Sequence, residues 1–376
     1  MIGTLSGLRV VDFTTTIAGP YCTRLLADLG ADVVKIEAPQ GDVLRSSPPL
    51  RNHASLAFGQ LNAGKRSVKL DLKRSDDVEV ARRLAGQADV LVENFRPGVM
   101  ARLGLDFNAL SDASPRLIYC AISGYGQTGP SAELPAYAPV IHAASGYDRA
   151  YQAYQPGRTT PDQCGIFTAD ILAGTYALSG ILAALHRRHT TGLGQLVDVS
   201  MFESMLALLL NDVQRAQLGT SSPPIAFQPF ATADDAVMIA LVSPKNFIGV
   251  ASAASRPDWL SLLQLERLEL KDFMNALEAW TRTQTSDACL ALLRRYGVPC
   301  SAYRSVAEAL NDPQIAHRGA LCEVQDSEGA FRVVAAPFHL SRDQPTVGQR
   351  VPGLGEHTHA VRASAEAGRW AVKVGA

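Results

Sequence analysis

Strand and helix signals alternate through the first half of this chain, and this feature most constrains its fold. Short runs rich in β-branched residues occupy 8–13, 31–37, 88–95 and 116–126. Between the first two runs, apolar residues recur at helical spacing until Gly30, and segment 76–87 repeats the helical pattern before the third run. Strands separated by helices form βαβ units. The sequence therefore predicts an α/β fold built on a parallel sheet.

Several common cofactor and nucleophile motifs are missing. The turn after the first predicted strand reads TTTIAGP over 14–20, so it lacks the GxGxxG fingerprint and disfavours a nicotinamide or flavin enzyme. Ser200 and Ser204 have no GxSxG context, which argues against a hydrolase elbow. His357 and His359 have no third ligand at a recognisable spacing, so no metal site is predicted.

The character of the sequence changes after residue 217, where a proline-containing loop follows a long helix predicted to begin at Met201. The later elements expected are a strand over 236–243, helices over 273–284 and 287–297, a connection over 298–305 and a helix over 306–314. We expect three parts: a large α/β domain over 1–217, a linker and small α+β domain over 218–325, and a segment over 326–376 that returns to the large domain.

Composition narrows the expected partners and location. Lysine and arginine total 35 against 36 acidic residues, so the net charge of −1 gives no reason to expect nucleic acid or an anionic membrane as a partner. The long apolar run 167–185 contains Asp170 and several glycines, which favours a buried core helix over a membrane span. The six scattered cysteines are typical of reduced thiols, and no targeting segment is recognised, so we expect a cytoplasmic protein.

Asp170 is the first candidate for chemistry. It stands in the first turn of the helix predicted over 167–189, where unpaired backbone N–H groups and the helix dipole stabilise a carboxylate. The alternative is a simple N-cap, a role that aspartate often fills. Small residues follow it, including Ala173, Gly174 and Gly180, and they allow a ligand, another chain or a packed helix to come close.

Two basic stretches are candidates for anion binding. Lys65, Arg66, Lys69 and Lys73 lie near an extended segment, where they either hold a phosphate or form a solvated strand face. Arg96 and Arg102 follow a predicted strand, and in open parallel sheets ligands bind at the carboxyl ends of strands. The glycine-rich turn 123–130 and His142 are weaker candidates, because a histidine among apolar residues is more often structural.

Several long motifs, in a fixed order, resemble the class III coenzyme A transferases, the group that includes formyl-CoA transferase, carnitine CoA transferase and the α-methylacyl-CoA racemases. The motifs are LRVVDFTTTIAGPYCTRLLADLGADVVKIE, NAGKRSVKLDLK, ADVLVENFRPGVMARLGL, SGYGQTGP, DILAGTYALSGILAALHRRHTTGLGQLVDVSMFES, GVPCSAYRSVAEALNDPQ and LGEHT. They span nearly the whole chain. The resemblance implies a large Rossmann-like domain plus a small domain, in an interlocked homodimer.

The resemblance also implies a mechanism. The family's nucleophile is an aspartate four residues before a glycine, and Asp170 with Gly174 matches that position. Such a carboxylate attacks an acyl-CoA thioester to give a mixed anhydride, and then carries CoA as an aspartyl thioester to an acceptor acid. Acyl-CoA and a carboxylic acid are the expected substrates, and no permanently bound cofactor or metal is implied.

The family's CoA contacts transfer residue by residue onto this sequence. The matching positions are Ile17, Ala18, Leu70, Asp71, Leu72, Lys73, Asn94, Phe95, Arg96, Arg102 and Tyr137. Lys73 and Arg102 keep a cation where the family uses one, so they are the candidates for the nucleotide phosphates.

Departures from the family pattern bear on the substrate. Ile17 replaces a glutamine of formyl-CoA transferase, Ala38 an arginine and Ala138 a glutamate. Formate and oxalate are therefore not the expected acids, and Ile17 favours a bulkier or more apolar one. Tyr137 stands near where the racemases place a catalytic histidine, and His142 lies five residues further on.

We therefore predict a CoA transferase acting on a small organic or dicarboxylic acid. Two alternatives stay open at this point: a 2-methylacyl-CoA racemase that uses Asp170 with a histidine such as His142, and an acyl-CoA binding protein without catalysis.

Overall fold

The computed structural model describes residues 3–155, 157–219, 227–262 and 270–370. The chain divides into two compact units, one formed by Met1–Ser221 with Ala316–Ala376 and the other by Ser222–Ile315. The second unit thus gives way to the first at 316, ahead of the expected 326, because the strand that begins at Leu321 pairs and packs within the first unit. Most of the predicted proline-containing linker lies outside the described residues.

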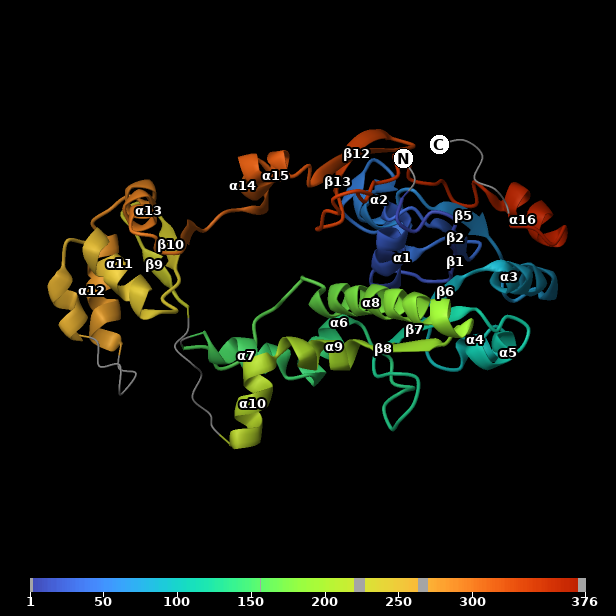
Figure 1. The fold of residues 1–376 in the computed structure, drawn as a ribbon, viewed down its shortest axis with the longest axis horizontal. Helices are drawn as coiled ribbons and strands as arrows, with labels where there is room; N and C mark the ends of the chain where they lie inside the picture. Colours follow the sequence, from blue (N-terminus) through green and yellow to red (C-terminus); the bar gives the residue numbers. More distant parts are fainter. Residues whose placement is uncertain (1–2, 156, 220–226, 263–269, 371–376) are drawn as a thin grey trace. The chain divides into compact units, whose positions relative to one another are not determined.

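A parallel six-stranded sheet forms the centre of the first unit (Figure 1), which confirms the predicted α/β class. Its strands are β1 (Arg9–Asp12), β2 (Asp32–Glu37), β5 (Arg66–Lys69), β6 (Val90–Glu93), β7 (Ile118–Ser123) and β8 (Leu196–Ser200). They lie in the order β5-β2-β1-β6-β7-β8, and each neighbouring pair is parallel. The order reverses between β1 and β6, and such a switch point is where open α/β sheets bind ligands.

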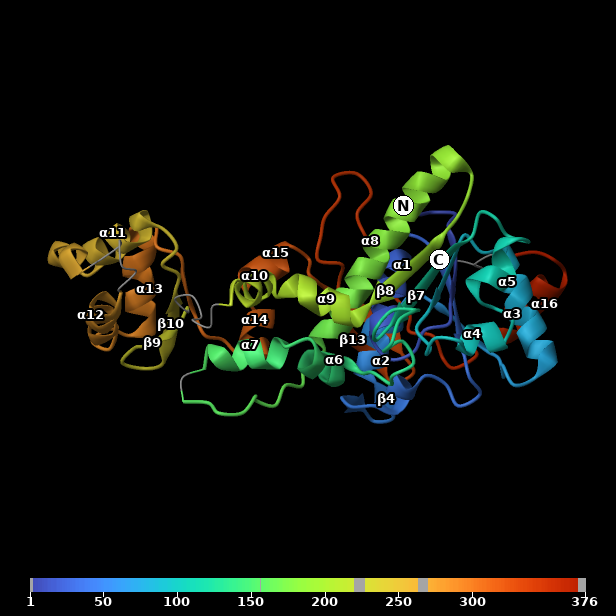
Figure 2. The ribbon, with the colours of Figure 1, turned by 90° about the horizontal axis from the view of Figure 1, so that it is seen from below.

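The helices of the first unit are α1 (Ala18–Asp28), α2 (Leu56–Asn62), α3 (Ser75–Gln87), α4 (Val99–Arg102), α5 (Phe107–Ser111), α6 (Ala138–Ala144), α7 (Tyr147–Ala153), α8 (Thr168–Thr191), α9 (Met201–Leu208), α10 (Leu210–Leu218) and α16 (Thr358–Glu366). They cover both faces of the sheet because alternate strand residues point to opposite sides. Val10 of β1 belongs to the core beneath α1, α6, α8 and α9, whereas Val11 belongs to the core beneath α3, α4, α5 and α16. Figure 2 shows the second group gathered on the side of the sheet away from α8.

Helix α8 follows the apolar run that contains Asp170, and its small residues serve packing within the chain. A Cβ on Gly174 would lie 2.5 Å from the Ala18 carbonyl oxygen, and one on Gly180 would lie 2.6 Å from Val197. The absence of these side chains lets α8 approach α1 and β8 closely. Among the described residues, α8 is the helix long and apolar enough to cross a membrane, by length and composition only. Its inner side is part of the core, as expected for a core helix.

The C-terminal segment packs on the edge of the sheet formed by β5. Strands β12 (Leu321–Asp326) and β13 (Gly329–Val334) pair as an antiparallel hairpin and share a small core with Ala63 and Val347. The His357 N–H donates to the Ser67 carbonyl oxygen at 2.9 Å and ties this segment to β5. Short pieces complete the unit: η1 (Val43–Ser46), β3 (Leu50–Arg51) and β4 (Ala54–Ser55).

The second unit is a small α+β body with a separate core. Strands β9 (Pro229–Ala231), β10 (Ala236–Ile239) and β11 (Cys300–Ala302) form an antiparallel sheet in the order β11-β10-β9. Helices α11 (Pro244–Ala253), α12 (Lys271–Thr281), α13 (Ser286–Arg295) and α14 (Val306–Leu310) accompany it, with η2 (Pro257–Leu262). Phe230, Phe247 and Phe273 lie at the centre of this core.

Three local predictions were wrong. The helix expected to continue from Met201 breaks at Leu209, whose ψ of 42° departs from helical geometry, and α10 follows. The expected connection over 298–305 contains β11, because its backbone pairs with β10. The helix expected over 306–314 is divided into α14 and α15 (Pro313–His317), since Asp312 accepts from the Gln314 N–H and caps a new helix whose first residue is proline.

Candidate active site

Asp170 is the third residue of α8, which begins at Thr168 after Phe167. It is therefore not the N-cap, and that alternative is wrong. Its carboxylate accepts a hydrogen bond from the Ala18 backbone N–H. Burial raises the pKa of Asp170 to about 6, and the Ala18 hydrogen bond partly offsets this effect. At pH 7 the group is therefore mainly ionised, as a carboxylate largely stripped of water.

Two helix N-termini meet at this carboxylate. Ala18 is the first residue of α1, so its N–H is one of the amides that an α-helix leaves without an internal partner. Asp170 accepts that amide while standing in the first turn of α8 itself. Both dipoles favour negative charge at this point. Gly174, one turn further along α8, permits the approach, because any side chain there would strike the Ala18 carbonyl.

His142, on α6, lies beside the same helix start. Its Nε2 accepts a hydrogen bond from the Ala169 N–H at 3.1 Å, so this nitrogen carries no proton. The side chain is buried, and burial lowers its pKa. His142 is thus a neutral group that satisfies an unpaired amide of α8. This arrangement is the structural role expected of a histidine among apolar residues.

The loops that follow β1 and β6 touch at the switch point of the sheet. The Asn94 side chain accepts from the Thr15 N–H at 2.9 Å and donates to the Thr15 carbonyl oxygen at 2.8 Å. Next to it, Glu93 accepts from the Phe95 N–H, and burial raises the pKa of Glu93 to about 8. The structure thus brings Asn94 to the loop that precedes Ala18, and engages its side-chain amide with protein backbone.

Two of the four cations in the predicted basic stretch are buried, and the other two are exposed. Lys65 is fully buried and forms an ion pair with Asp12 at 3.0 Å. Arg66 forms a two-point ion pair with Asp32. Lys69 and Lys73 are exposed. Only half of the four cations are therefore free to meet a ligand.

Arg96 and Arg102 are exposed after β6, and within the described residues neither guanidinium forms an ion pair with a carboxylate. Gly98 between them has a φ of 82°, a left-handed conformation that glycine adopts without strain. This turn leads the chain from Arg96 into α4, which carries Arg102 at its end. The two cations thus stand at the carboxyl end of β6, where the sequence predicted anion contacts.

The other predicted CoA contacts differ in which of their groups are accessible to a ligand. The side chain of Leu70 is buried in the core beneath α3, so this residue presents only backbone groups to a ligand. Asp71 accepts from the Lys73 N–H, and Leu72 and Ile17 are half-buried. Tyr137 is 71% exposed at the start of α6. Within the described part of the chain, no three His, Cys, Asp or Glu side chains group to hold a metal.

Sequence reasoning missed a group of buried charged residues under the loop at 14–17. Asp12 ends β1, Lys35 lies inside β2, and Asp42 follows β2; all three are at most 3% exposed. Lys65 lies against Asp12. One signal was present: charges at 12 and 35 interrupt otherwise apolar strands, and a charge in a buried strand requires a partner.

Known proteins match almost the whole chain. Residues 5–358 match the family described as CoA-transferase family III. The succinyl-CoA:mesaconate CoA-transferase of Haloarcula marismortui is 34% identical over 381 residues, covering 95% of each chain. The acetyl-CoA:oxalate CoA-transferase of Acetobacter aceti is 35% identical over 378 residues, covering 96% of this chain and 95% of that protein.

The fold also matches that of a known protein. The crystal structure of a CaiB/BaiF family protein from Brucella suis is 31% identical and superposes with a TM-score of 0.83, covering 97% of this chain and all of that one. A chain with this strand order, and with an aspartate in the first turn of α8, thus matches this family over residues 5–358. The chain belongs to CoA-transferase family III, and it is an enzyme of that family.

Proposed function

We propose that the enzyme moves CoA between two carboxylic acids through covalent intermediates on Asp170. One observation carries the proposal. The carboxylate of Asp170 is ionised, largely desolvated and held by the Ala18 N–H at two helix N-termini. Desolvation makes a carboxylate a better nucleophile, and the amide fixes its direction.

The steps balance without any other reactant. An Asp170 oxygen attacks the thioester carbon, the C–S bond breaks, and CoA leaves as a thiolate. The thiolate attacks the side-chain carbonyl of the mixed anhydride, which releases the donor acid as a carboxylate and leaves an aspartyl-CoA thioester. The acceptor carboxylate displaces CoA to form a second anhydride, and the thiolate attacks its acyl carbon. Asp170 is restored, and backbone N–H groups stabilise each oxyanion.

For CoA itself we propose contacts at the switch point. The backbone of Ile17 and Ala18 and the segment 70–73 supply polar groups, and Phe95 and Tyr137 supply apolar surface. Arg102 and Lys73 bind the nucleotide phosphates, supported by their exposure and the absence of carboxylate partners among the described residues.

The acceptor is proposed to be a dicarboxylate. One relative at 34% identity uses mesaconate and another at 35% uses oxalate, so identity alone does not choose between these acids. Ile17 is half-buried next to Ala18 and favours a larger or more apolar acid than oxalate. Succinyl-CoA and acetyl-CoA are the first donors to try.

We also propose a cytoplasmic homodimer. The outer side of α8 exposes Ile171, Tyr176 and Leu182, and an apolar face of this kind is typical of a surface covered by another subunit. Light scattering coupled to gel filtration tests this: a dimer mass is expected, and a monomer at micromolar concentration contradicts it.

The experiment for the main proposal is intact-mass spectrometry of the protein incubated with a panel of acyl-CoAs and trapped with hydroxylamine or borohydride. Wild type is compared with Asp170→Asn, which keeps the shape of the side chain. An adduct at Asp170 that the variant lacks supports the mechanism, and the acyl-CoA that forms it identifies the donor. Acceptors to test are mesaconate, glutarate, succinate, oxalate and formate.

The two alternatives predict different results. A racemase exchanges the α-proton with solvent deuterium without an acceptor acid and forms no adduct; Nε2 of His142, already engaged by Ala169, weakens this alternative. A binding protein without catalysis keeps its CoA affinity in Asp170→Asn and turns over no acid pair.

A further inference from the structure

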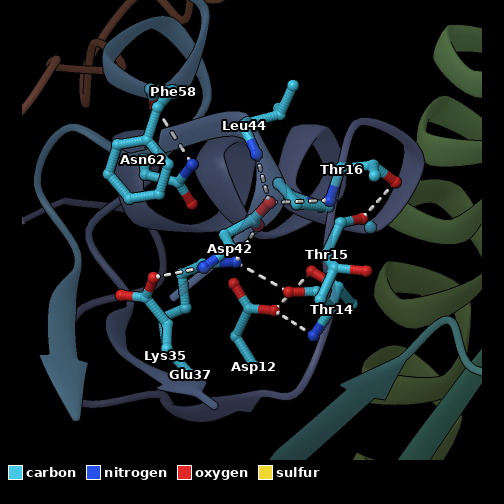
Figure 3. A network of polar contacts seen from close by, with 12 residues as sticks. Asp12, Thr14, Thr15, Thr16, Lys35, Glu37, Asp42, Leu44, Phe58 and Asn62 are labelled. Atoms are coloured by element: carbon cyan, nitrogen blue, oxygen red, sulfur yellow. Dashed lines mark hydrogen bonds and ion pairs between the residues drawn. The ribbon is translucent and has the colours of Figure 1, made fainter. Parts of the chain in front are cut away.

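The loop between β1 and α1, residues 14–17, brings the Ala18 N–H to Asp170, and side chains from other elements hold it. The Thr14 N–H donates to Asp12 Oδ1 at 2.9 Å, and the Thr14 carbonyl oxygen accepts from Lys35 Nζ at 2.7 Å. The Thr16 N–H donates to Asp42 Oδ1 at 3.3 Å. Figure 3 shows these side chains converging on the loop.

Asn94 completes the set from the end of β6. It engages both the N–H and the carbonyl oxygen of Thr15. Three successive residues of the loop are therefore tied by four side chains from outside it. We call Asp12, Lys35, Asp42 and Asn94 the loop clamp.

The charges of the loop clamp are paired and fully buried. Lys35 Nζ lies 3.0 Å from Asp42 Oδ2, and Lys65 Nζ lies 3.0 Å from Asp12 Oδ2, with all four side chains 0% exposed. Desolvating two ion pairs is costly, and apolar residues of the same volume often replace such pairs without loss of stability. Carboxylates and ammonium groups do supply several hydrogen bonds in fixed directions, which suits them to holding a backbone.

The loop 14–17 also contains a strained backbone conformation, which requires stabilising contacts from its surroundings. Thr16 has a φ of 61°, a left-handed value that β-branched residues rarely adopt. Strained residues of this kind persist where the surroundings fix them, and they concentrate at functional sites. On the other side of the loop, a Cβ on Gly19 would lie 2.2 Å from the Thr14 side chain, so the loop is packed against the start of α1.

From this geometry we infer that the loop clamp is a positioning device for the reaction: it holds residues 14–17 so that the Ala18 N–H stays directed at the Asp170 carboxylate. The inference rests on the proposed function and adds positioning residues to it. Asn94 thus acts through the loop, in place of the direct side-chain contact with CoA that the family resemblance implies.

The test of this inference follows the titration of Asp170, so the charge states of the neighbouring groups matter. Among the described residues, two titratable side chains from other elements contact α8 near its start, His142 through the Ala169 N–H and Tyr21 through Thr175. Burial lowers the pKa of His142 and raises that of Tyr21, so both are neutral near pH 7. The acidic side chains on β8 and α9, Asp198 and Glu203, are exposed. The hydrogen bond from Ala18 is the contact that favours the charged form of Asp170.

The test compares Asn94→Ala with Asn246→Ala. Asn246 is a matched control, because its side chain accepts from the Val242 and Ser243 N–H groups in the other unit. A water-soluble carbodiimide with a glycine ester labels carboxyl groups, and peptide mass spectrometry follows Asp170 against pH. Hydrogen exchange of the peptide covering 13–24 and CoA affinity by calorimetry complete the set. Asn94→Ser is a milder variant, to be used if exchange shows that Asn94→Ala is unfolded throughout.

The inference expects three results together for Asn94→Ala. The labelling midpoint of Asp170 rises by about one pH unit as the Ala18 hydrogen bond is lost. Exchange increases within 13–24, and CoA binds within threefold of wild type. Asn246→Ala leaves the Asp170 midpoint unchanged.

Two results overturn it: an unchanged midpoint in Asn94→Ala, or an equal rise in Asn246→Ala. If the midpoint is unchanged and CoA affinity falls more than tenfold, Asn94 is a ligand contact. Labelling requires no turnover. A wild-type protein that forms no acyl adduct therefore refutes the proposed function and leaves this measurement interpretable.

Discussion

The backbone N–H of Ala18 donates to the carboxylate of Asp170, and so joins the first residue of α1 to the first turn of α8. Neither residue can hold this arrangement alone. Ala18 depends on the loop after β1, and Asp170 depends on the close packing that Gly174 allows between the two helices.

The pH dependence of the enzyme should report Asp170. Because burial raises its folded pKa to about 6 from 3.8, the kcat/KM of CoA transfer, which reports the free enzyme, is expected to reach half its maximum near pH 6. The folded state binds the extra proton between these values, so the contribution of this group to stability is lost as pH rises from about 4 to about 6. Asp170→Asn removes the buried charge, and urea unfolding at pH 7 should show a gain of about 1–2 kcal/mol with transfer lost at least about 10³-fold. A loss of stability in this variant contradicts the assigned burial.

Gly174→Ala should separate α8 from α1. Its Cβ would lie 2.5 Å from the backbone oxygen of Ala18, which cannot move aside as a flexible side chain does. We expect a loss of about 1–3 kcal/mol in denaturant unfolding and a larger relative loss of transfer than of CoA affinity. Gly86→Ala, in helix α3, is the control: its Cβ would meet nothing closer than the Ser114 hydroxyl at 3.8 Å, so this variant should keep its stability and its activity. If both variants keep full activity, the close packing is not needed for the reaction.

Lys65→Met should be strongly destabilising. It leaves the fully buried Asp12 carboxylate without its ion-pair partner, and removing one member of a buried pair costs about 3–5 kcal/mol. Lys69→Met, at the exposed end of β5, should change the unfolding free energy by less than about 0.5 kcal/mol. Similar values for the two variants count against a structural ion pair at Lys65.

Arg102→Gln should weaken CoA binding about tenfold without changing stability, because the guanidinium is exposed and forms no ion pair with a carboxylate of the described residues. The measurement is calorimetric titration with CoA and with 3′-dephospho-CoA at two salt concentrations. Arg102 is assigned to a nucleotide phosphate if the variant discriminates the two ligands less than wild type does. Arg318→Gln, another exposed cation, is the control. Equal weakening by both variants points to general electrostatics.

His142→Phe should show that this histidine is not a base in the reaction. It removes the acceptor of the Ala169 N–H, and a lost helix cap costs about 1 kcal/mol. Transfer is expected to stay within about tenfold of wild type. His142→Gln keeps an acceptor atom and should recover part of the stability. If the wild-type enzyme exchanges the α-proton and His142→Phe does not, the racemase alternative is restored.

The regular elements of the large unit were predictable because their signals are local. The β-branched runs at 8–13, 31–37, 88–95 and 116–126 became β1, β2, β6 and β7, and their alternating residues divide between the two cores. Where a boundary had no local mark, prediction failed. No glycine or proline stands at Leu209, and β11 exists because β10 lies beside it.

The candidate site likewise has features that the sequence predicted and features that it did not. The sequence by itself determined that Asp170 heads a helix, that Gly174 follows one turn later, and that the chain belongs to its family, because these are matters of residue type and spacing. Only the tertiary structure decided that Lys65 and Arg66 face inward, that Asn94 holds Thr15, and that the Ala18 amide meets Asp170. Those contacts join residues far apart in the chain. Their burial and charge depend on how the sheet and its helices pack, which no single stretch of sequence contains.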